Sequence, residues 1–306
     1  GIANTHVHVS DSNLGPSTMR NLGISVARGE YISFIDGDDY IEGESLLHIT
    51  NILSKLASSC DLVFANYELE PPIGVEHCHF SLQYDDSLEY LSVNTKIITF
   101  IRDHSAYLRN IWSRFYSKAF LLENSIYFIE SARASEDLEF LTRCIYYSKN
   151  VLVTNKIFYH YRRRLGSLSK AISSNYILGI PSILSSILTL LSSVNSKSVE
   201  YSFLKSGLDR IVHNSPSKFL ASSEYELIEL ANKNTDSIST IVSLTQDPSL
   251  LASSELISFI ADMRAPNCFV EYQKFITSIL LDVIDKSLNE YYVFCAGSLG
   301  QAIALT

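Results

Sequence analysis

The chain has 306 residues, of which 46% are hydrophobic and 19% charged, the balance of a folded globular protein rather than a disordered one. This length is enough for one large domain or two ordinary ones. The formal net charge of -9 argues against a general nucleic-acid binder, which would present a basic surface, so no nucleic-acid partner is expected.

The five cysteines, at positions 60, 78, 144, 268 and 295, form no C-x-x-C pair. They therefore predict neither a disulfide framework nor a zinc ribbon, and a reducing compartment is the expected setting. The opening residues lack the charged and apolar regions of a secretory signal. Together these observations predict a cytoplasmic protein.

The first seventy residues alternate strand-like and helix-like patterns. In chain order they predict strand 5–9, helix 17–28 capped by Ser17 and ended by Gly29, strand 31–35, loop 36–40, helix 45–58 and strand 61–67. This alternation predicts an α/β sandwich with at least part of its sheet parallel. Ligands of such sheets collect outside the carboxyl ends of strands, which is where the acidic loop after residue 35 lies.

The middle of the chain continues this pattern and then changes. An irregular polar stretch at 71–87 precedes a predicted helix at 103–124, a second helix at 135–148 and a strand at 150–161. From about residue 170 the sequence becomes rich in leucine and serine and predicts helices to about residue 288. We therefore predict a domain over 1–170 and a helical region over 171–288.

Residues 177–194 are uncharged, and their serines and threonine recur at three- and four-residue steps. This stripe predicts an amphipathic helix that faces a core rather than a membrane span. Farther on, residues 291–300 read Y-Y-V-F-C-A-G-S-L-G, a strand that runs into a glycine-rich turn. The pattern predicts that residues 289–306 begin a Rossmann-like unit, which is truncated because only six residues follow the turn.

Three carboxylates follow the strand at 31–35, namely Asp36, Asp38 and Asp39. Their mutual repulsion favours a divalent cation such as Mn²⁺ or Mg²⁺, which prefers oxygen ligands and keeps positions for substrate phosphates. Gly37 allows the tight turn that directs nearby carboxylates at one ion. The alternative is a solvated acidic turn in which one aspartate caps the next helix.

Two blocks of sequence resemble family 2 of the inverting glycosyltransferases. Residues 13–24, 27–32 and 34–39 read N-L-G-P-S-T-M-R-N-L-G-I, A-R-G-E-Y-I and F-I-D-G-D-D, with Met19 where the family has alanine. Residues 111–116, 135–140 and 158–169 read I-W-S-R-F-Y, S-E-D-L-E-F and F-Y-H-Y-R-R-R-L-G-S-L-S, with Ser135 where glycine is common. The resemblance covers about residues 5–170.

The resemblance implies the GT-A fold, a Rossmann-like sheet that holds a nucleotide sugar. The family's domain normally opens with a strand, a helix and a second strand that hold the base and ribose, and this chain begins after them. We therefore expect an incomplete GT-A domain in which the strand at 5–9 is poorly paired. We also expect that residues 1–306 alone bind the donor weakly.

The resemblance also implies a mechanism. Asp36 and Asp38, with His160 as a further ligand, would hold Mn²⁺ or Mg²⁺ against the departing diphosphate. Asp137 would be the general base that deprotonates the acceptor hydroxyl, so that direct displacement inverts the anomeric centre. The acids at 136 and 137 have a plainer alternative, because carboxylates also favour a helix N-terminus. For His160 the alternative is a packed core residue.

The remaining site residues are predicted from their places in the same motifs. We expect donor binding by residues Asp36, Arg20, Arg162, Ser167 and Ser169, and acceptor binding by residues Trp112 and Glu136. Guanidinium groups suit a pyrophosphate because they offer paired donors. Arg20 has the alternative of bracing the acidic loop, and the run beginning at Arg162 that of an exposed basic surface. Trp112 has the alternative of core packing.

The expected partners are a nucleotide-diphosphate sugar and a glycan or other hydroxyl acceptor, with peripheral membrane association left open. Two further hypotheses remain at this point. The first is a non-catalytic scaffold with the same fold, although clustered carboxylates have no use in a scaffold. The second is a nucleotidyltransferase, which generally carries a basic glycine-rich loop near its first strand.

Overall fold

The computed structural model describes residues 6–56, 60–70, 89–91, 97–99, 110–132, 135–162 and 174–213. The donor residues predicted at Ser167 and Ser169 lie outside these ranges. So do the predicted Rossmann-like start at 289–306 and the helical region beyond residue 213.

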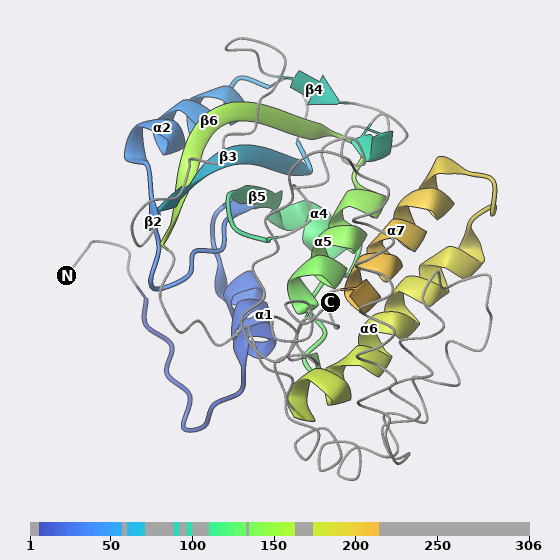
Figure 1. Cartoon of the computed structure of the whole chain (residues 1–306). Coiled ribbons are helices and arrows are strands. Elements are labelled where there is room, and N and C mark those ends of the chain that lie inside the picture. Colours follow the sequence, from blue (N-terminus) through green and yellow to red (C-terminus); the bar gives the residue numbers. More distant parts are fainter. Residues whose placement is uncertain are drawn as a thin grey trace, which may run out of the picture.

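A mixed sheet forms the centre of the molecule (Figure 1). Its strands are β1 (Tyr31–Ile32), β2 (Tyr40–Ile41), β3 (Leu62–Glu70), β4 (Glu89–Leu91), β5 (Arg114–Ser117) and β6 (Val151–Arg162). They lie in the order β1-β5-β3-β6-β2, with β4 also paired to β6. The long β3–β6 pair is parallel and the other pairs are antiparallel, so the expectation of a partly parallel sheet is confirmed.

Helices cover both faces of this sheet, and α5, α6 and α7 lie together on one side (Figure 1). They are α1 (Pro16–Val26), α2 (Gly43–Leu53), α4 (Lys118–Glu123), α5 (Glu136–Tyr147), α6 (Ser174–Ser193) and α7 (Val199–His213). On the α2 side, Ile49 packs with Phe115 and Phe158 in a buried cluster. On the opposite side, a second group, the α5-side aromatic cluster, consists of Phe34, Tyr116, Phe128 and Phe140.

The predicted helix at 103–124 is wrong for its described part. Residues 114–117 form strand β5 between β1 and β3, and only residues 118–123 are helical, with Ser117 Oγ capping α4 by accepting from the Phe120 N–H. All four residues of β5 are buried. A strand buried on both faces shows no polar alternation, so its short aromatic run is easily taken for the apolar side of a helix.

The amino-terminal prediction was also wrong for residues 6–9, which form no strand and leave Val7 and Val9 81% and 87% exposed. Helix α1 begins one residue before Ser17, at Pro16, after Gly15 with a φ of 82°. Ser17 is not the cap, because it is buried and its hydroxyl donates to the Ala132 carbonyl. The helix ends at Val26 rather than near Gly29.

The strand predicted at 31–35 is shorter than expected, because only Tyr31 and Ile32 pair, with β5. The chain then turns, and the Asp39 N–H donates to the Asp36 carbonyl at 3.1 Å. The predictions of helix 135–148 and strand 150–161 are confirmed by α5 and β6. The acidic turn at 36–39 therefore follows the short edge strand β1 after residues 33–35, and it lies beside the end of β6.

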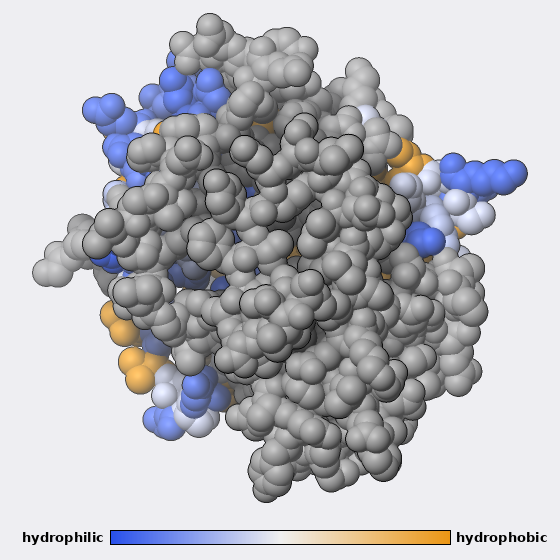
Figure 2. Space-filling model, in the orientation of Figure 1, coloured by the Kyte–Doolittle hydropathy of each residue, from blue (hydrophilic) through white to orange (hydrophobic). Residues whose placement is uncertain are grey.

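Helix α6 is amphipathic as expected, with Ile183 and Ile187 buried and Ser185, Thr189 and Ser192 exposed. No helix in the described part of the chain combines the length and apolarity needed to cross a bilayer. Figure 2 shows hydrophilic residues at the tip where α6 turns into α7, a segment that includes the exposed Lys197.

Helices α6 and α7 pack directly on α5. The fully buried Glu139 of α5 accepts hydrogen bonds from Arg143 Nε at 2.5 Å and from the Ser186 hydroxyl of α6 at 2.6 Å. Gly207 of α7 lies so close to Thr142 of α5 that a Cβ added to it would stand 3.3 Å from the threonine hydroxyl. The first two helices of the predicted helical region therefore share a core with the sheet domain.

We expect Gly207→Leu to lower the free energy of unfolding by about 1–3 kcal/mol, because the new side chain overpacks the contact between α7 and α5. Urea unfolding measures the change. Gly23→Ala in α1 is the control, because a Cβ there meets nothing within 4 Å and should raise stability by about 0.5–1 kcal/mol. An unchanged stability of Gly207→Leu would contradict the packing of α7 on α5.

Candidate active site

The acidic turn at residues 36–39 is fastened to the end of β6. Asp39 accepts the Tyr159 hydroxyl on Oδ2 at 2.6 Å and the backbone N–H of Arg162 on Oδ1 at 2.9 Å. The Tyr159 hydroxyl also accepts the backbone N–H of Asp36 at 3.1 Å, and Arg162 Nε donates to the Asp38 carbonyl. Asp39 thus has both carboxylate oxygens engaged in holding the turn, in keeping with a structural role.

Arg20 of α1 joins this turn to the start of α5. Its Nη1 lies 2.8 Å from Asp137 Oδ1 and 3.3 Å from Glu136 Oε1, and its Nη2 lies 3.8 Å from Asp36 Oδ1. The side chain of Arg20 is 18% exposed, that of Asp137 30% and that of Asp36 43%. The partly buried guanidinium of Arg20 is therefore shared by three carboxylates that are themselves partly exposed to solvent.

The guanidinium of Arg20 is held in place by an aromatic ring and by a neighbouring residue on its own helix. It lies over the ring of Phe128, 5.3 Å from the centroid, and that ring stacks on Phe140 of α5 at 3.9 Å. The next residue on α1, Asn21, accepts the N–H of Phe128 at 2.8 Å and donates to its carbonyl at 2.9 Å. The α5-side aromatic cluster therefore sets the position of the charged groups above it.

Burial raises the pKa of Asp137 to about 7, against the Arg20 cation, which lowers it, while Glu136 and Asp36 raise it further. Burial also raises the pKa of Asp36, where Arg20 again opposes the shift and Asp39 and Asp38 add to it. A carboxyl group with a pKa near neutrality accepts a proton more readily than an ordinary aspartate, which is the property required of a general base.

Trp112 lies on the other face of the sheet, where its indole stacks on Tyr159 at 4.7 Å and on Tyr161 at 5.4 Å, with Tyr67 against its edge. The indole packs partly buried against the α2-side core. These contacts match the core-packing alternative for Trp112, and they place it directly behind the tyrosine that holds the acidic turn.

His160 follows Tyr159 on β6, so its side chain points to the opposite face of the strand. Its ring stacks on Tyr40 at 4.4 Å, and its two nitrogens lie 3.8 Å from Glu42 and 3.4 Å from Glu68. The residue is buried, as the core alternative for it expected.

The oxygen ligands predicted for a hard divalent cation are the carboxylates of Asp36 and Asp38. Across the described ranges, no three His, Cys, Asp or Glu side chains are grouped so that they would hold a metal ion by themselves. Mg²⁺ is commonly bound by only one or two carboxylates, with waters and substrate phosphates supplying the other positions. The two aspartates fit a cation of that kind, which arrives with a phosphate-bearing substrate.

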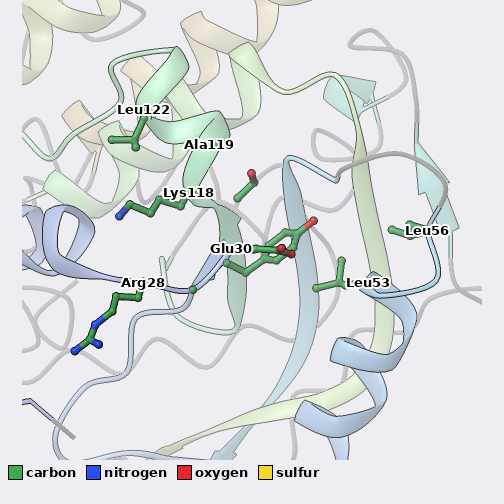
Figure 3. Close-up of a pocket in the computed structure, with 10 residues that line it drawn as sticks. Arg28, Glu30, Leu53, Leu56, Lys118, Ala119 and Leu122 are labelled. Carbon is green, nitrogen blue, oxygen red and sulfur yellow. The ribbon is translucent and has the colours of Figure 1, made fainter. Parts of the chain in front are cut away.

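Another part of the surface is hollowed at the opposite end of β1 (Figure 3). That pocket has Arg28, Lys118 and Leu122 on one side and Leu53 and Leu56 on the other. It includes none of the residues predicted for chemistry, which gather where the chain leaves β1 and where α5 begins.

The structure thus brings together Arg20, Asp36, Glu136 and Asp137, and it sets Arg162 against the backbone of the acidic turn. It places His160 elsewhere on β6, and Trp112 just before β5, stacked on two tyrosines of β6. Sequence reasoning missed Tyr159, although that residue lies inside the matched motif at 158–169, two positions before Tyr161.

The family profile described as Glycosyltransferase like family 2 matches residues 2–186. The chain is 26% identical over 193 residues to glycosyltransferase GlyA of Streptococcus pneumoniae serotype 4, covering 61% of this chain and 27% of that protein. It is 27% identical over 164 residues to the putative glycosyltransferase EpsH of Bacillus subtilis, covering 52% of this chain and 45% of that protein.

The crystal structure of S. aureus TarS 1-349 in complex with UDP-GlcNAc has the same GT-A-like fold. It superposes with a TM-score of 0.56 at 20% identity over 93% of this chain and 75% of that chain. The chain spans about a quarter to a half of the length of the curated relatives it matches. Because the profile match covers more than half of the chain, the protein belongs to the glycosyltransferase-like family 2.

Proposed function

We propose that this protein transfers a sugar from a nucleotide-diphosphate donor to a hydroxyl group of a glycan or related polymer, with a divalent cation and with inversion. One observation carries the proposal: the guanidinium of Arg20 lies close to Asp36 of the acidic turn and to the two carboxylates at the start of α5. Among the relatives, TarS of Staphylococcus aureus is named a poly(ribitol-phosphate) beta-N-acetylglucosaminyltransferase, and a polyhydroxyl polymer is the acceptor class we propose.

Asp36 and Asp38 are the residues that would hold Mn²⁺ or Mg²⁺. Asp39 is engaged by Tyr159 and Arg162, so we assign the ion to the other two aspartates of the turn. When bound, the cation supplies charge that stabilises the departing diphosphate. The exposed Arg162, at the end of β6, contacts the same turn, and we propose it with Ser167 and Ser169 as donor-binding residues.

Asp137 is the proposed general base. As the acceptor oxygen forms its bond to the anomeric carbon, its proton passes to the Asp137 carboxylate and the bond from that carbon to the diphosphate oxygen breaks. The attack comes from the side opposite the leaving group, so the configuration inverts. Glu136 is proposed to bind the acceptor beside it, and its contact with Arg20 holds the pair of acids near the acidic turn.

Arg20 acts in this proposal as a brace and charge partner rather than as a ligand of the donor. Its guanidinium lies within 3.8 Å of three carboxylates, and a diphosphate would have to displace them to bind it. It opposes the burial that raises the pKa of Asp137 and so keeps that carboxyl group able to ionise near neutral pH. We propose that the reaction takes place in the cytoplasm.

Asp137→Asn should reduce sugar transfer by about 10²- to 10⁴-fold, because the amide cannot take the acceptor proton. Binding of the donor in the presence of Mn²⁺ should be retained, since the acidic turn is untouched. Release of the nucleoside diphosphate from a panel of nucleotide sugars measures the loss. Glu123→Gln, an exposed carboxyl on α4, is the control. Unchanged turnover in Asp137→Asn would remove the base assignment.

The dependence of kcat/KM on pH should report the same carboxyl group. Because the pKa of Asp137 is raised to about 7 and only the ionised form accepts a proton, kcat/KM should fall about tenfold for each pH unit below 7 and level off above it. A profile that stays flat down to pH 5 would contradict the assignment.

Arg20→Met should move this profile to higher pH, because the cation that lowers the pKa of Asp137 is removed. Arg20→Lys should restore part of the shift, since it returns the charge without the paired donors. Arg28→Met is the control at an exposed arginine beyond the end of α1. A profile that is the same in Arg20→Met and in the wild type would show that Arg20 does not act on this carboxyl group.

A further inference from the structure

Tyr159 contacts both ends of the acidic turn, although it is not one of the proposed metal ligands. Its hydroxyl donates to Asp39 Oδ2 at 2.6 Å and accepts the backbone N–H of Asp36 at 3.1 Å. Asp36 and Asp39 are the two ends of the acidic turn, and the Asp39 N–H closes the same turn on the Asp36 carbonyl at 3.1 Å. A single phenol oxygen therefore ties both ends of the turn to β6.

The phenol itself has little freedom to move. Tyr159 is fully buried, and its ring stacks on the Trp112 indole at 4.7 Å with an angle of 13° between the planes. Tyr67 packs edge-on against the same indole and is the register partner of Tyr159 on β3. The position of the hydroxyl is thus set by the sheet and by the α2-side core rather than by the flexible turn.

This arrangement matters because Asp36 and Asp38 carry like charges that separate when nothing holds the backbone between them. Mutation of a residue that fixes the orientation of a ligand without touching the ion commonly lowers metal affinity by about 10- to 100-fold. Asp39 cannot hold the turn by charge alone, since its oxygens need donors at defined places, and β6 supplies two of them at Tyr159 and Arg162.

We propose that Tyr159, supported by the stacked indole of Trp112, is a positioning residue that holds Asp36 and Asp38 in the geometry that binds the divalent cation. This inference rests on the proposed function, because it assumes that the two aspartates bind a cation. It assigns Trp112 to the support of the acidic turn, a role that its contacts favour over direct contact with an acceptor sugar.

The chain offers its own probe for a test. Trp112 is the one tryptophan among the 306 residues, and it lies against the tyrosine in question. Because Mn²⁺ is paramagnetic, binding at the turn should quench the fluorescence of Trp112, and a titration of residues 1–306 with Mn²⁺ alone then gives the midpoint for metal binding. Mg²⁺ added in excess should reverse the quenching at the same site.

We expect Tyr159→Phe to raise the Mn²⁺ midpoint by about 10- to 100-fold, because it removes the hydroxyl and keeps the stacked ring. Tyr161→Phe is the matched control, since its ring stacks on the same indole while the turn is held through Tyr159, and its midpoint should equal that of the wild type. Asp39→Asn tests the same clamp from its other side and should raise the midpoint in the same direction.

The double variant of Tyr159→Phe and Asp39→Asn separates positioning from a general loss of stability. If the two side chains act through one hydrogen bond, their effects on the Mn²⁺ midpoint should be clearly less than additive. Thermal unfolding of each variant without metal gives the stability change, which should not follow the order of the midpoints.

The outcomes distinguish this inference from the proposed function. An absence of saturable quenching in the wild type would overturn the cation site and this inference with it. Saturable quenching with equal midpoints in the wild type and Tyr159→Phe would overturn the role of Tyr159 alone. If Tyr159→Phe does not fold, an unchanged midpoint in Asp39→Asn would overturn it equally.

Discussion

The proposed site depends on the positive charge of the Arg20 guanidinium. Arg20 of α1 lies between the carboxylates of Asp137, 117 residues away in the sequence, and Asp36, 16 residues away. Without a positive charge these carboxylates would repel one another. The guanidinium suits this task because its paired donors are rigid and remain charged at all relevant pH values. Its place is fixed by the Phe128 ring below it.

The fold supplies two separate supports for this charged centre. On one side, β6 holds the acidic turn through Tyr159 and the Arg162 backbone, with the α2-side core behind them. On the other side, α5 presents its first turn while Glu139, only two residues after Asp137, is buried in a hydrogen-bonded pair with Arg143 and is met by α6. Each half of the site is therefore rigid by itself, and Arg20 joins the halves.

The packing of α6 and α7 bears on the organisation of the chain. The change in composition near residue 170 suggested a boundary between two domains, yet Ser186 and Gly207 contact buried residues of α5. A buried carboxylate such as Glu139 is costly unless its partners are in place, so these helices help to stabilise the helix that carries the proposed base. The family profile, which extends to residue 186, also passes the boundary suggested by composition.

The sequence by itself predicted which residues form the proposed site. The motifs around Asp36, Asp38 and Asp137 predicted the chemistry through their resemblance to family 2, and the acidic loop was expected at the carboxyl end of a strand. It also placed α5 and β6 closely, because these elements are long and have a clear periodicity. It failed at Trp112 and Phe115, where a short buried strand and a helix have the same apolar pattern.

Only the tertiary structure decided which groups each of these side chains contacts. Arg20, predicted at the donor or as a brace for the acidic loop, contacts three carboxylates. Trp112, predicted at the acceptor or in the core, stacks on two tyrosines, and Tyr159 was not singled out at all. The physical reason is that a motif specifies residue types and spacing, whereas the role of a side chain depends on which distant groups the fold brings within hydrogen-bonding distance. The pKa of Asp137 is likewise raised mainly by burial, which only the fold decides, while Glu136 beside it in the sequence and the distant Asp36 raise it further.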